Sequence, residues 1–108
     1  MKLGIMLKNQ SGLYGDIAGY FRQSKYFFLL DIENSKIKHS RIVENTLAQN
    51  SMRRFAVDEL LKYRVTHVIA GEMSVSVQQK LANAGVKVFG YSGNVKEALE
   101  DFLVTKTS

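Results

Sequence analysis

Two adjacent arginines lie near the start of a segment with a helical pattern. They are Arg53 and Arg54, within Ser51–Tyr63, whose large apolar side chains recur at helical spacing. Positive charge at a helix start opposes the helix dipole, and a bound anion would remove that conflict because guanidinium and backbone N–H groups converge there. The alternative is that both arginines are solvated surface side chains. Further basic residues lie on one expected strand: Lys36, Lys38 and Arg41.

A glycine-containing segment follows the first expected strand, as a phosphate-binding loop would. It reads GLYGDIAG, from Gly12 to Gly19. Its glycine spacing matches neither GxGxxG nor GxxxxGK[ST], and no clear helical pattern opens after it. We therefore interpret the segment as a flexible loop.

The carboxylates do not form a nuclease pattern. A magnesium-dependent nuclease of the ribonuclease H type needs several converging carboxylates, one of them inside the first strand. The expected first strand, Lys2–Leu7, has none. Asp31 and Glu33 share one face of a strand but lie beside a hairpin turn, so we interpret them as a solvated strand end.

No other motif supports a conventional enzyme. His39 and His67 are the two histidines, and they form neither an HxxxH nor an HExxH pair. His67 lies in a short apolar run, which is more typical of a packed, hydrogen-bonded side chain than of a metal ligand. The chain has no cysteine, which excludes disulfides, thiolate metal sites and cysteine nucleophiles. Sequence order alone assembles no Ser-His-Asp set.

The composition is that of one globular domain over residues 1–108, with 45% hydrophobic and 23% charged residues. The formal charge of +5 favours anionic partners such as phosphates, nucleic acid or anionic clusters, although it also serves solubility. No apolar run approaches the roughly 20 residues of a membrane span. We expect a cytoplasmic protein, in agreement with the lack of cysteine.

The elements that position these residues alternate along the chain. Apolar runs predict strands, and apolar stripes at helical spacing predict helices. The predicted strands are Lys2–Leu7, Lys25–Glu33, Lys36–Glu44, Thr66–Ala70 and Val86–Gly90; the predicted helices are Ser51–Tyr63, the segment from Ser74 to Ala84 and the segment from Asn94 to Leu103. The order β-β-β-α-β-α-β-α indicates an α/β fold, with a mixed five-stranded sheet of one antiparallel hairpin followed by parallel strands and helices on both faces.

Several local signals fix the ends of these elements. Ser74 and Asn94 are predicted N-caps, with Glu97 at the third position of the last helix, and Gly85 suits a helix C-terminus. Asn34 and Ser35 form a plausible two-residue turn. Strict alternation along the following strand places Lys36, Lys38 and Ser40 on one face and Ile37, His39, Arg41 and Val43 on the other.

Three stretches in a fixed order carry a family resemblance: KYFFLLDIENSKIK, ELLKYRVTHVIAGEM and QQKLANAGVKVFGYSGNVKEALEDFL. Together they resemble the dinitrogenase iron–molybdenum cofactor biosynthesis family. Its NifX-like domains also occur at the end of NifB-type proteins. The resemblance runs from Met1 to Leu103. It implies a ribonuclease H-like α/β fold and a non-enzymatic role, in which the domain binds, holds or passes on an anionic metal–sulfur cofactor without a cysteine cage.

The chain departs from the family at the site itself. Where the family commonly has His-Phe-Gly-Arg followed by a small residue, this chain has Tyr20-Phe21-Arg22-Gln23-Ser24, so tyrosine replaces the histidine that is a candidate metal ligand. The family's Gly-rich loop before the first helix is replaced by residues 48–54. After Gly71, the turn reads Glu72-Met73-Ser74, and Glu72 would repel an anion.

The resemblance implies a cofactor pocket with a defined set of residues and partners. The candidate cofactor-binding residues are Tyr20, Phe21, Arg22, Arg53, Arg54, Gly71 and Ser74. The expected ligand is an iron–molybdenum–sulfur or other metal–sulfur cluster, the expected partners are cofactor-assembly proteins, and a homodimer is a further expectation. One alternative is a protein–protein interaction module that keeps the fold, has lost the cluster site and uses a strand edge or the hairpin. Nucleic-acid binding rests on charge and fold analogy alone.

Overall fold

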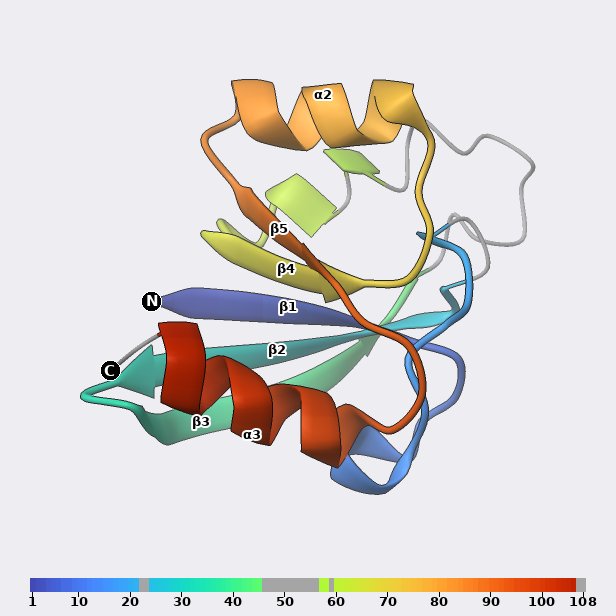
Figure 1. The fold of residues 1–108 in the computed structure, drawn as a ribbon. Coiled ribbons are helices and arrows are strands. Elements are labelled where there is room, and N and C mark those ends of the chain that lie inside the picture. Colours follow the sequence, from blue (N-terminus) through green and yellow to red (C-terminus); the bar gives the residue numbers. More distant parts are fainter. Residues whose placement is uncertain (22–23, 46–56, 59, 107–108) are drawn as a thin grey trace.

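The computed structural model describes residues 1–21, 24–45, 57–58 and 60–106. Its elements follow in the order β1 (Lys2–Leu7), the 3₁₀ turn η1 (Gly12–Tyr14), β2 (Tyr26–Glu33), β3 (Lys36–Glu44), β4 (His67–Ala70), α2 (Val75–Asn83), β5 (Lys87–Gly90) and α3 (Val95–Lys106) (Figure 1). Most of the helix predicted over residues 51–63 lies outside the described residues. None of the described helices is long and apolar enough to cross a membrane.

The strands form one mixed sheet in the order β3-β2-β1-β4-β5. β1 pairs antiparallel with β2 and parallel with β4, β2 pairs antiparallel with β3, and β4 pairs parallel with β5. The α/β class and the mixed five-stranded sheet predicted from the sequence are therefore confirmed. The sheet has two outer strands, β3 at one side and β5 at the other.

Two separate apolar clusters cover the two faces of the sheet. Because side chains alternate along a strand, Leu3, Ile5 and Leu7 of β1 face one cluster and Met6 faces the other. α3 packs on the first cluster through Leu99 and its neighbours, while α2 packs on the second. Figure 1 shows α2 and α3 on opposite sides of the sheet, as the sequence predicts.

The β2–β3 hairpin closes through a tight turn and contains a register shift. Asn34 and Ser35 both have positive φ, 53° and 63°, as a type I′ turn requires. The register shifts between Asp31 and Ile32, so that Ile32 pairs with Ile37. A bulge of this kind resets the alternation of side chains.

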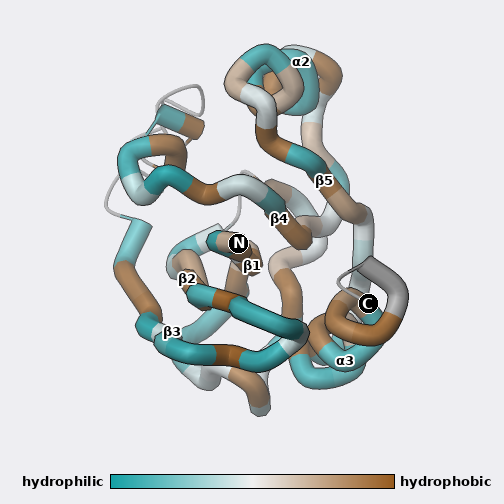
Figure 2. Tube along the Cα trace, turned by 90° about the vertical axis from the view of Figure 1, so that its left-hand side faces the viewer, coloured by the Kyte–Doolittle hydropathy of each residue, from teal (hydrophilic) through white to brown (hydrophobic). Residues whose placement is uncertain are grey.

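Because of the bulge, the predicted face of Ile37 on β3 is wrong. Strict alternation groups Ile37 with His39, but the pairing places Ile37 on the face of Ser40 and Ile42. The residues of β3 are largely exposed, and Figure 2 shows β3 as mostly hydrophilic. Only Val43 is half-buried along this strand.

The segment after β1 is a loop, as predicted, and contains the 3₁₀ turn η1; among the described residues between it and β2 no α-helix follows it. Several backbone hydrogen bonds hold this loop: the Ala18 N–H donates to the Met6 carbonyl, and the Ile17 N–H donates to the Gly93 carbonyl. These bonds tie the loop to the end of β1 and to the segment before α3.

The predicted N-caps of both helices and the glycine after α2 are confirmed, while α3 runs to Lys106, three residues beyond the predicted Leu103. The Ser74 hydroxyl accepts a hydrogen bond from the Val77 N–H at 3.3 Å, and the Asn94 side-chain oxygen accepts one from the Glu97 N–H at 3.1 Å. Gly85 follows α2 with a φ of +79°, a conformation that glycine adopts without strain. Short-range capping therefore marks the starts of both helices and the end of α2.

His67 is a packed side chain, as its position in an apolar strand predicts. Its ring stacks on Phe89 with centroids 6.1 Å apart and meets the edge of Phe102 at 5.9 Å. Its Nδ1 lies 2.8 Å from the Thr66 hydroxyl oxygen. Burial, followed by the positive charges of Lys87 and the N-terminal amine, lowers the pKa of His67 below its ordinary 6.5.

Candidate functional site

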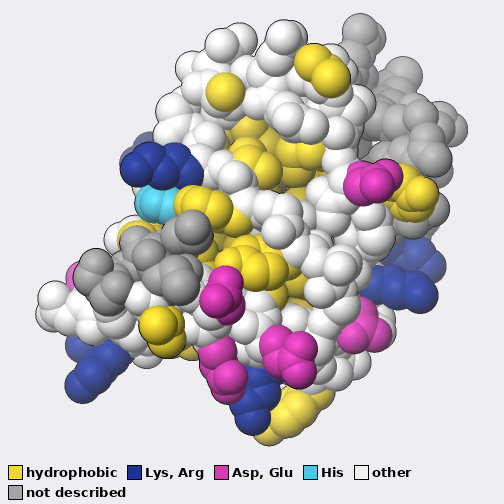
Figure 3. All heavy atoms as spheres, viewed as in Figure 1, with side chains coloured by type: hydrophobic (Ala, Val, Ile, Leu, Met, Phe, Trp, Pro, Cys, Tyr) yellow, Lys and Arg dark blue, Asp and Glu magenta, His cyan; other side chains and the backbone are white. Residues whose placement is uncertain are grey.

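An open groove of about 900 Å³ lies between α2 and the carboxyl ends of β4 and β5. Figure 3 shows hydrophobic side chains exposed in the hollow beneath α2. The groove is lined by the loop before β2, the turn after β4, one face of α2, and β5 with the residues that follow it: Gly19, Tyr20, Gly71, Glu72, Met73, Gln78, Ala82, Val86, Val88, Gly90, Tyr91 and Ser92. The carboxyl ends of parallel strands are the usual place for a ligand in an α/β sheet.

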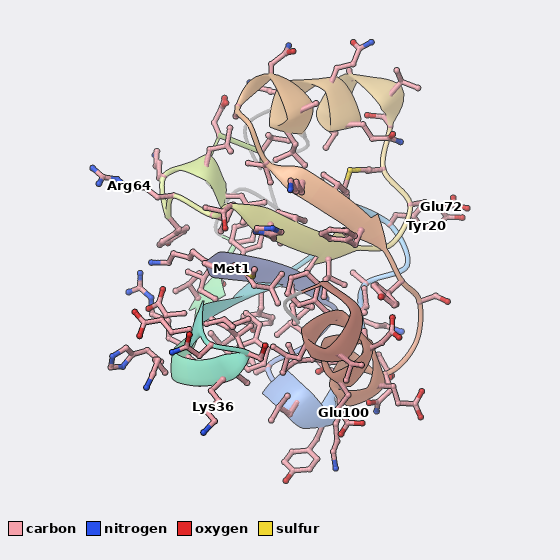
Figure 4. All side chains as sticks on the ribbon, turned by 60° about the vertical axis from the view of Figure 1, so that its left-hand side comes forward. Met1, Tyr20, Lys36, Arg64, Glu72 and Glu100 are labelled. Carbon is pink, nitrogen blue, oxygen red and sulfur yellow. The ribbon has the colours of Figure 1, made fainter. Side chains whose placement is uncertain are left out.

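Close backbone contact between two segments builds one end of the groove. The Glu72 N–H donates to the Gly19 carbonyl at 2.9 Å, and the Phe21 N–H donates to the Glu72 carbonyl at 2.7 Å. A Cβ on Gly71 would lie only 2.4 Å from the carbonyl oxygens of Ala18 and Gly19, so glycine is required at this position. Figure 4 shows the side chains of Tyr20 and Glu72 together at this end.

The structure brings two of the predicted site residues to the groove. Tyr20, which is 44% exposed, and Gly71 both line it. Phe21 is 3% exposed and belongs to the cluster beneath α2, so its side chain packs in the core. Ser74 is absent from the lining and caps α2. The other three predicted residues, Arg22, Arg53 and Arg54, lie outside the described residues.

Sequence reasoning missed the wall formed by α2 and β5. Gln78 and Ala82 lie one helical turn apart on α2, while Val86 and Val88 alternate toward the same side of the sheet. The Gln78 side-chain amide donates to the Met73 carbonyl at 3.0 Å, which holds it against the turn after β4. The spacing of each pair was visible in the sequence, but only the packing of α2 against β5 brings the two pairs together.

The described lining carries little charge. Glu72 is its one carboxylate, and no lysine, arginine or histidine lies among the described lining residues. The hydroxyl of Tyr91 donates a hydrogen bond to the Asp101 carboxylate of α3. That bond, followed by burial and the negative charge of Asp101, raises the pKa of Tyr91 above its ordinary value. Tyr91 is therefore a neutral hydrogen-bonded side chain at the groove wall.

The described lining of the groove offers polar groups and open space rather than a set of metal ligands. Within the described ranges, no cluster of three or more histidine, aspartate, glutamate or cysteine side chains could ligate a metal. Gly19 and Gly90 leave open space where a side chain would stand. The walls carry the polar side chains of Tyr20, Gln78 and Ser92 besides those of Glu72 and Tyr91.

A second, smaller hollow of about 590 Å³ lies where β1 begins and β2 ends. It includes Asp31 and Glu33, the pair that the sequence indicated as a solvated strand end. Asp31 lies 3.8 Å from the Lys2 ammonium, and Glu33 is exposed. The mixed charges and the exposure agree with that interpretation.

Comparison with known proteins supports the family and the fold. The family model described as dinitrogenase iron–molybdenum cofactor matches residues 1–105. No curated protein matches the chain.

Three solved structures share the fold. PH0822 is 18% identical with a TM-score of 0.84, covering 98% of this chain and 93% of its own. The apo orange protein of Desulfovibrio gigas is 21% identical with a TM-score of 0.82, covering 95% and 87%. A Thermotoga protein provisionally described as NifB is 23% identical with a TM-score of 0.75, covering 98% and 89%. Identities this low show the fold alone.

Proposed function

Because the chain belongs to the dinitrogenase iron–molybdenum cofactor family, we propose that it is a non-enzymatic carrier that binds and passes on an anionic metal–sulfur cofactor. The observation that carries the proposal is the family match over residues 1–105. The open groove at the carboxyl ends of β4 and β5 supports it, because its volume suits a ligand larger than a single ion. The cofactor is the cargo of this protein, of the iron–molybdenum–sulfur kind or a related cluster.

Glycine and polar side chains would hold the cargo within the described part of the groove. At Gly19 and Gly90 the cargo can approach the backbone closely, since no side chain intervenes. Tyr20, in the loop before β2, and Gln78, on α2, supply polar groups to the lining. The helix start capped by Ser74 lies beside the groove, at the end of the turn that holds Met73, and its dipole favours negative charge.

Three arginines are proposed to supply the positive charge. Arg22 follows Tyr20 and Phe21 closely in the chain, and Arg53 with Arg54 begins the segment predicted to be helical. A guanidinium group binds an anion through several hydrogen bonds at once, which makes arginine suited to this role. Glu72 acts against it, because its carboxylate repels an anion at the same groove.

An anaerobic titration tests the proposal. The protein is mixed with tetrathiomolybdate, with and without copper, and in a second series with an iron–sulfur cofactor, followed by gel filtration and metal analysis. We expect metal to co-elute at a stable stoichiometry with a shifted absorption spectrum. If no metal is retained from any of these species, the carrier function is wrong.

Matched variants then test the assigned residues. Replacing Arg53 and Arg54 together with Ala should weaken retention by about tenfold or more, whereas replacing Lys36 and Lys38 on β3 should leave it unchanged. Glu72→Gln should strengthen retention, because it removes the opposing charge. Unchanged retention in the arginine variant would remove those residues from the pocket.

The remaining expectations belong to this proposal. They are the ribonuclease H-like relationship of the fold, a cytoplasmic location, cofactor-assembly proteins as partners, and a homodimer. Each is independent of the groove geometry. Sedimentation over a range of protein concentrations tests the homodimer directly.

A further inference from the structure

The outer edge of β5 presents backbone groups in an ordered row. The Lys87 N–H donates to the Thr66 carbonyl, and the Tyr91 N–H donates to the Ala70 carbonyl, so these residues face β4. Alternate residues of a strand direct their N–H and C=O groups to opposite sides. Val88 and Gly90 therefore direct theirs away from β4, and in the described part of the chain no strand pairs with that side.

The same two residues line the groove. Val88 is half-buried and packs with Val86 on the cluster beneath α2. Gly90 is exposed, and a Cβ built on it meets no atom within 4 Å. An extended chain laid along β5 would thus find hydrogen-bonding groups at its edge, an apolar wall beside Val88 and an open position beside Gly90.

The groove end nearest Gly90 is negative. Gly90 pairs with Ala70, and the chain then runs from Ala70 through Gly71 to Glu72. Glu72 is exposed, and none of the ion pairs found among the described residues involves its carboxylate. A long basic side chain beside Gly90 could reach it, since glycine leaves the intervening space open.

We propose that the β5 edge binds an extended segment of a partner protein, which adds to the sheet as a further strand. The segment carries an apolar residue opposite Val88 and a lysine or arginine two positions away, opposite Gly90. Residues two apart in a strand share a face, so both side chains point into the groove, the first against Val88 and the second toward Glu72. This binding requires no metal–sulfur cargo and stands whether or not the carrier function holds.

The test uses capped synthetic peptides and the full chain without added metal. The probe is a heptapeptide of serine and threonine that contains one valine and one arginine two positions apart. Binding is followed by residue-resolved amide chemical shifts. We expect saturable shifts at Val88, Gly90 and Glu72, and at least about a tenfold loss of affinity when the peptide arginine becomes glutamate.

Two protein variants sharpen the test. Gly90→Pro removes one outward N–H, which proline tolerates at a strand edge, and should reduce affinity by about tenfold. The control is Ser40→Pro on β3: the Asn45 N–H donates to the Lys25 carbonyl, so alternation directs the Ser40 N–H outward as well. This control should bind the peptide normally.

A charge-reversal variant of Glu72 tests the proposal even if Gly90→Pro fails to fold. Glu72→Lys should bind the arginine peptide weakly. It should bind the glutamate peptide with most of the affinity that the unaltered protein has for the arginine peptide. Absence of saturable binding up to millimolar peptide, shifts located at β3, or equal binding of both peptides by Glu72→Lys would each overturn the proposal.

Discussion

The two outer strands of the sheet are opposite in character. β3 is nine residues long, exposed along almost its whole length and mostly hydrophilic (Figure 2). β5 is four residues long, half-buried at Val88 and Phe89, and flanked by an apolar groove. Exposure alone would make β3 the better surface for another chain.

The features of the two strand edges favour β5 over β3 as the docking surface. β3 carries Lys36, Lys38 and Arg41, and the bulge opposite Asp31 and Ile32 interrupts its regular course. Charged side chains and bulges are the features by which proteins protect a strand edge from unwanted pairing. β5 lacks such a bulge in its pairing with β4, and its outward backbone groups open on a groove with an apolar wall. A docking edge is therefore recognised by what lies beside it rather than by its length.

The largest expected difference concerns packing beneath the groove. Leu81 of α2 is fully buried, whereas Ile42 of β3 is 37% exposed. Leu81→Ala should lower the free energy of unfolding by about 3 kcal/mol, because it leaves a cavity between α2 and the sheet. Ile42→Ala should cost less than about 1 kcal/mol. Urea unfolding measures the free energy of unfolding of both variants. Equal decreases in the two would contradict this prediction.

The next largest effect concerns the close contact at the groove end. Gly71→Ala places a methyl group 2.4 Å from two backbone carbonyl oxygens, which must move apart. We expect a loss of about 2 kcal/mol, since backbone atoms cannot rotate away as a side chain can. Gly90→Ala is the matched control, because open space surrounds that position. Its free energy of unfolding should change by less than about 0.5 kcal/mol. A cost for Gly90→Ala equal to that of Gly71→Ala would show that the contact is not the cause.

A smaller effect is expected at the start of α2. Ser74→Ala removes the hydroxyl that accepts from the Val77 N–H and should cost about 1 kcal/mol. Ser40→Ala, at an exposed position of β3, should be nearly neutral. Thermal unfolding of the two variants is sufficient, and Ser74→Asp should recover most of the loss because aspartate also caps helices.

The smallest effect is a dependence of stability on pH. The pKa of His67 is lowered in the folded protein, so the unfolded chain takes up its proton first as the pH falls. The free energy of unfolding should therefore decrease as the pH drops below about 6.5 and should level off below the folded pKa. His67→Asn should remove this slope, while His39→Asn on β3 should leave it in place. A slope that survives in His67→Asn belongs to another group.

The sequence predicts the strands and both described helices because their signals are local. Apolar runs mark β1, β2 and β4, and Ser74 and Asn94 act within one helical turn of themselves. The groove is different, since its walls come from four separate segments of the chain. They meet through the pairing of β4 with β5, the packing of α2 on the sheet, and the backbone hydrogen bonds between the loop before β2 and the turn after β4. The prediction of which face of β3 carries Ile37 was wrong, because alternation alone does not reveal a bulge.

Some of the groove residues could be predicted from the sequence and others could not. Tyr20 and Gly71 reach the groove because backbone hydrogen bonds join their segments, and the resemblance pointed to both. Phe21 follows Tyr20 directly in the sequence, but its side chain packs in the core cluster beneath α2. Gln78 and Val88 belong to no motif, so nothing in their residue types marked them as groove residues before the fold was known.

The packing of α3 on β1 has a consequence for synthesis on the ribosome. β1 and β2 present an apolar face that α3 covers through residues such as Leu99 and Phe102. That face stays uncovered until α3 has been translated, which takes on the order of several seconds after β2 emerges. The nascent chain therefore offers chaperones a transient apolar surface on this face, after all five strands have been translated and before α3 can cover it.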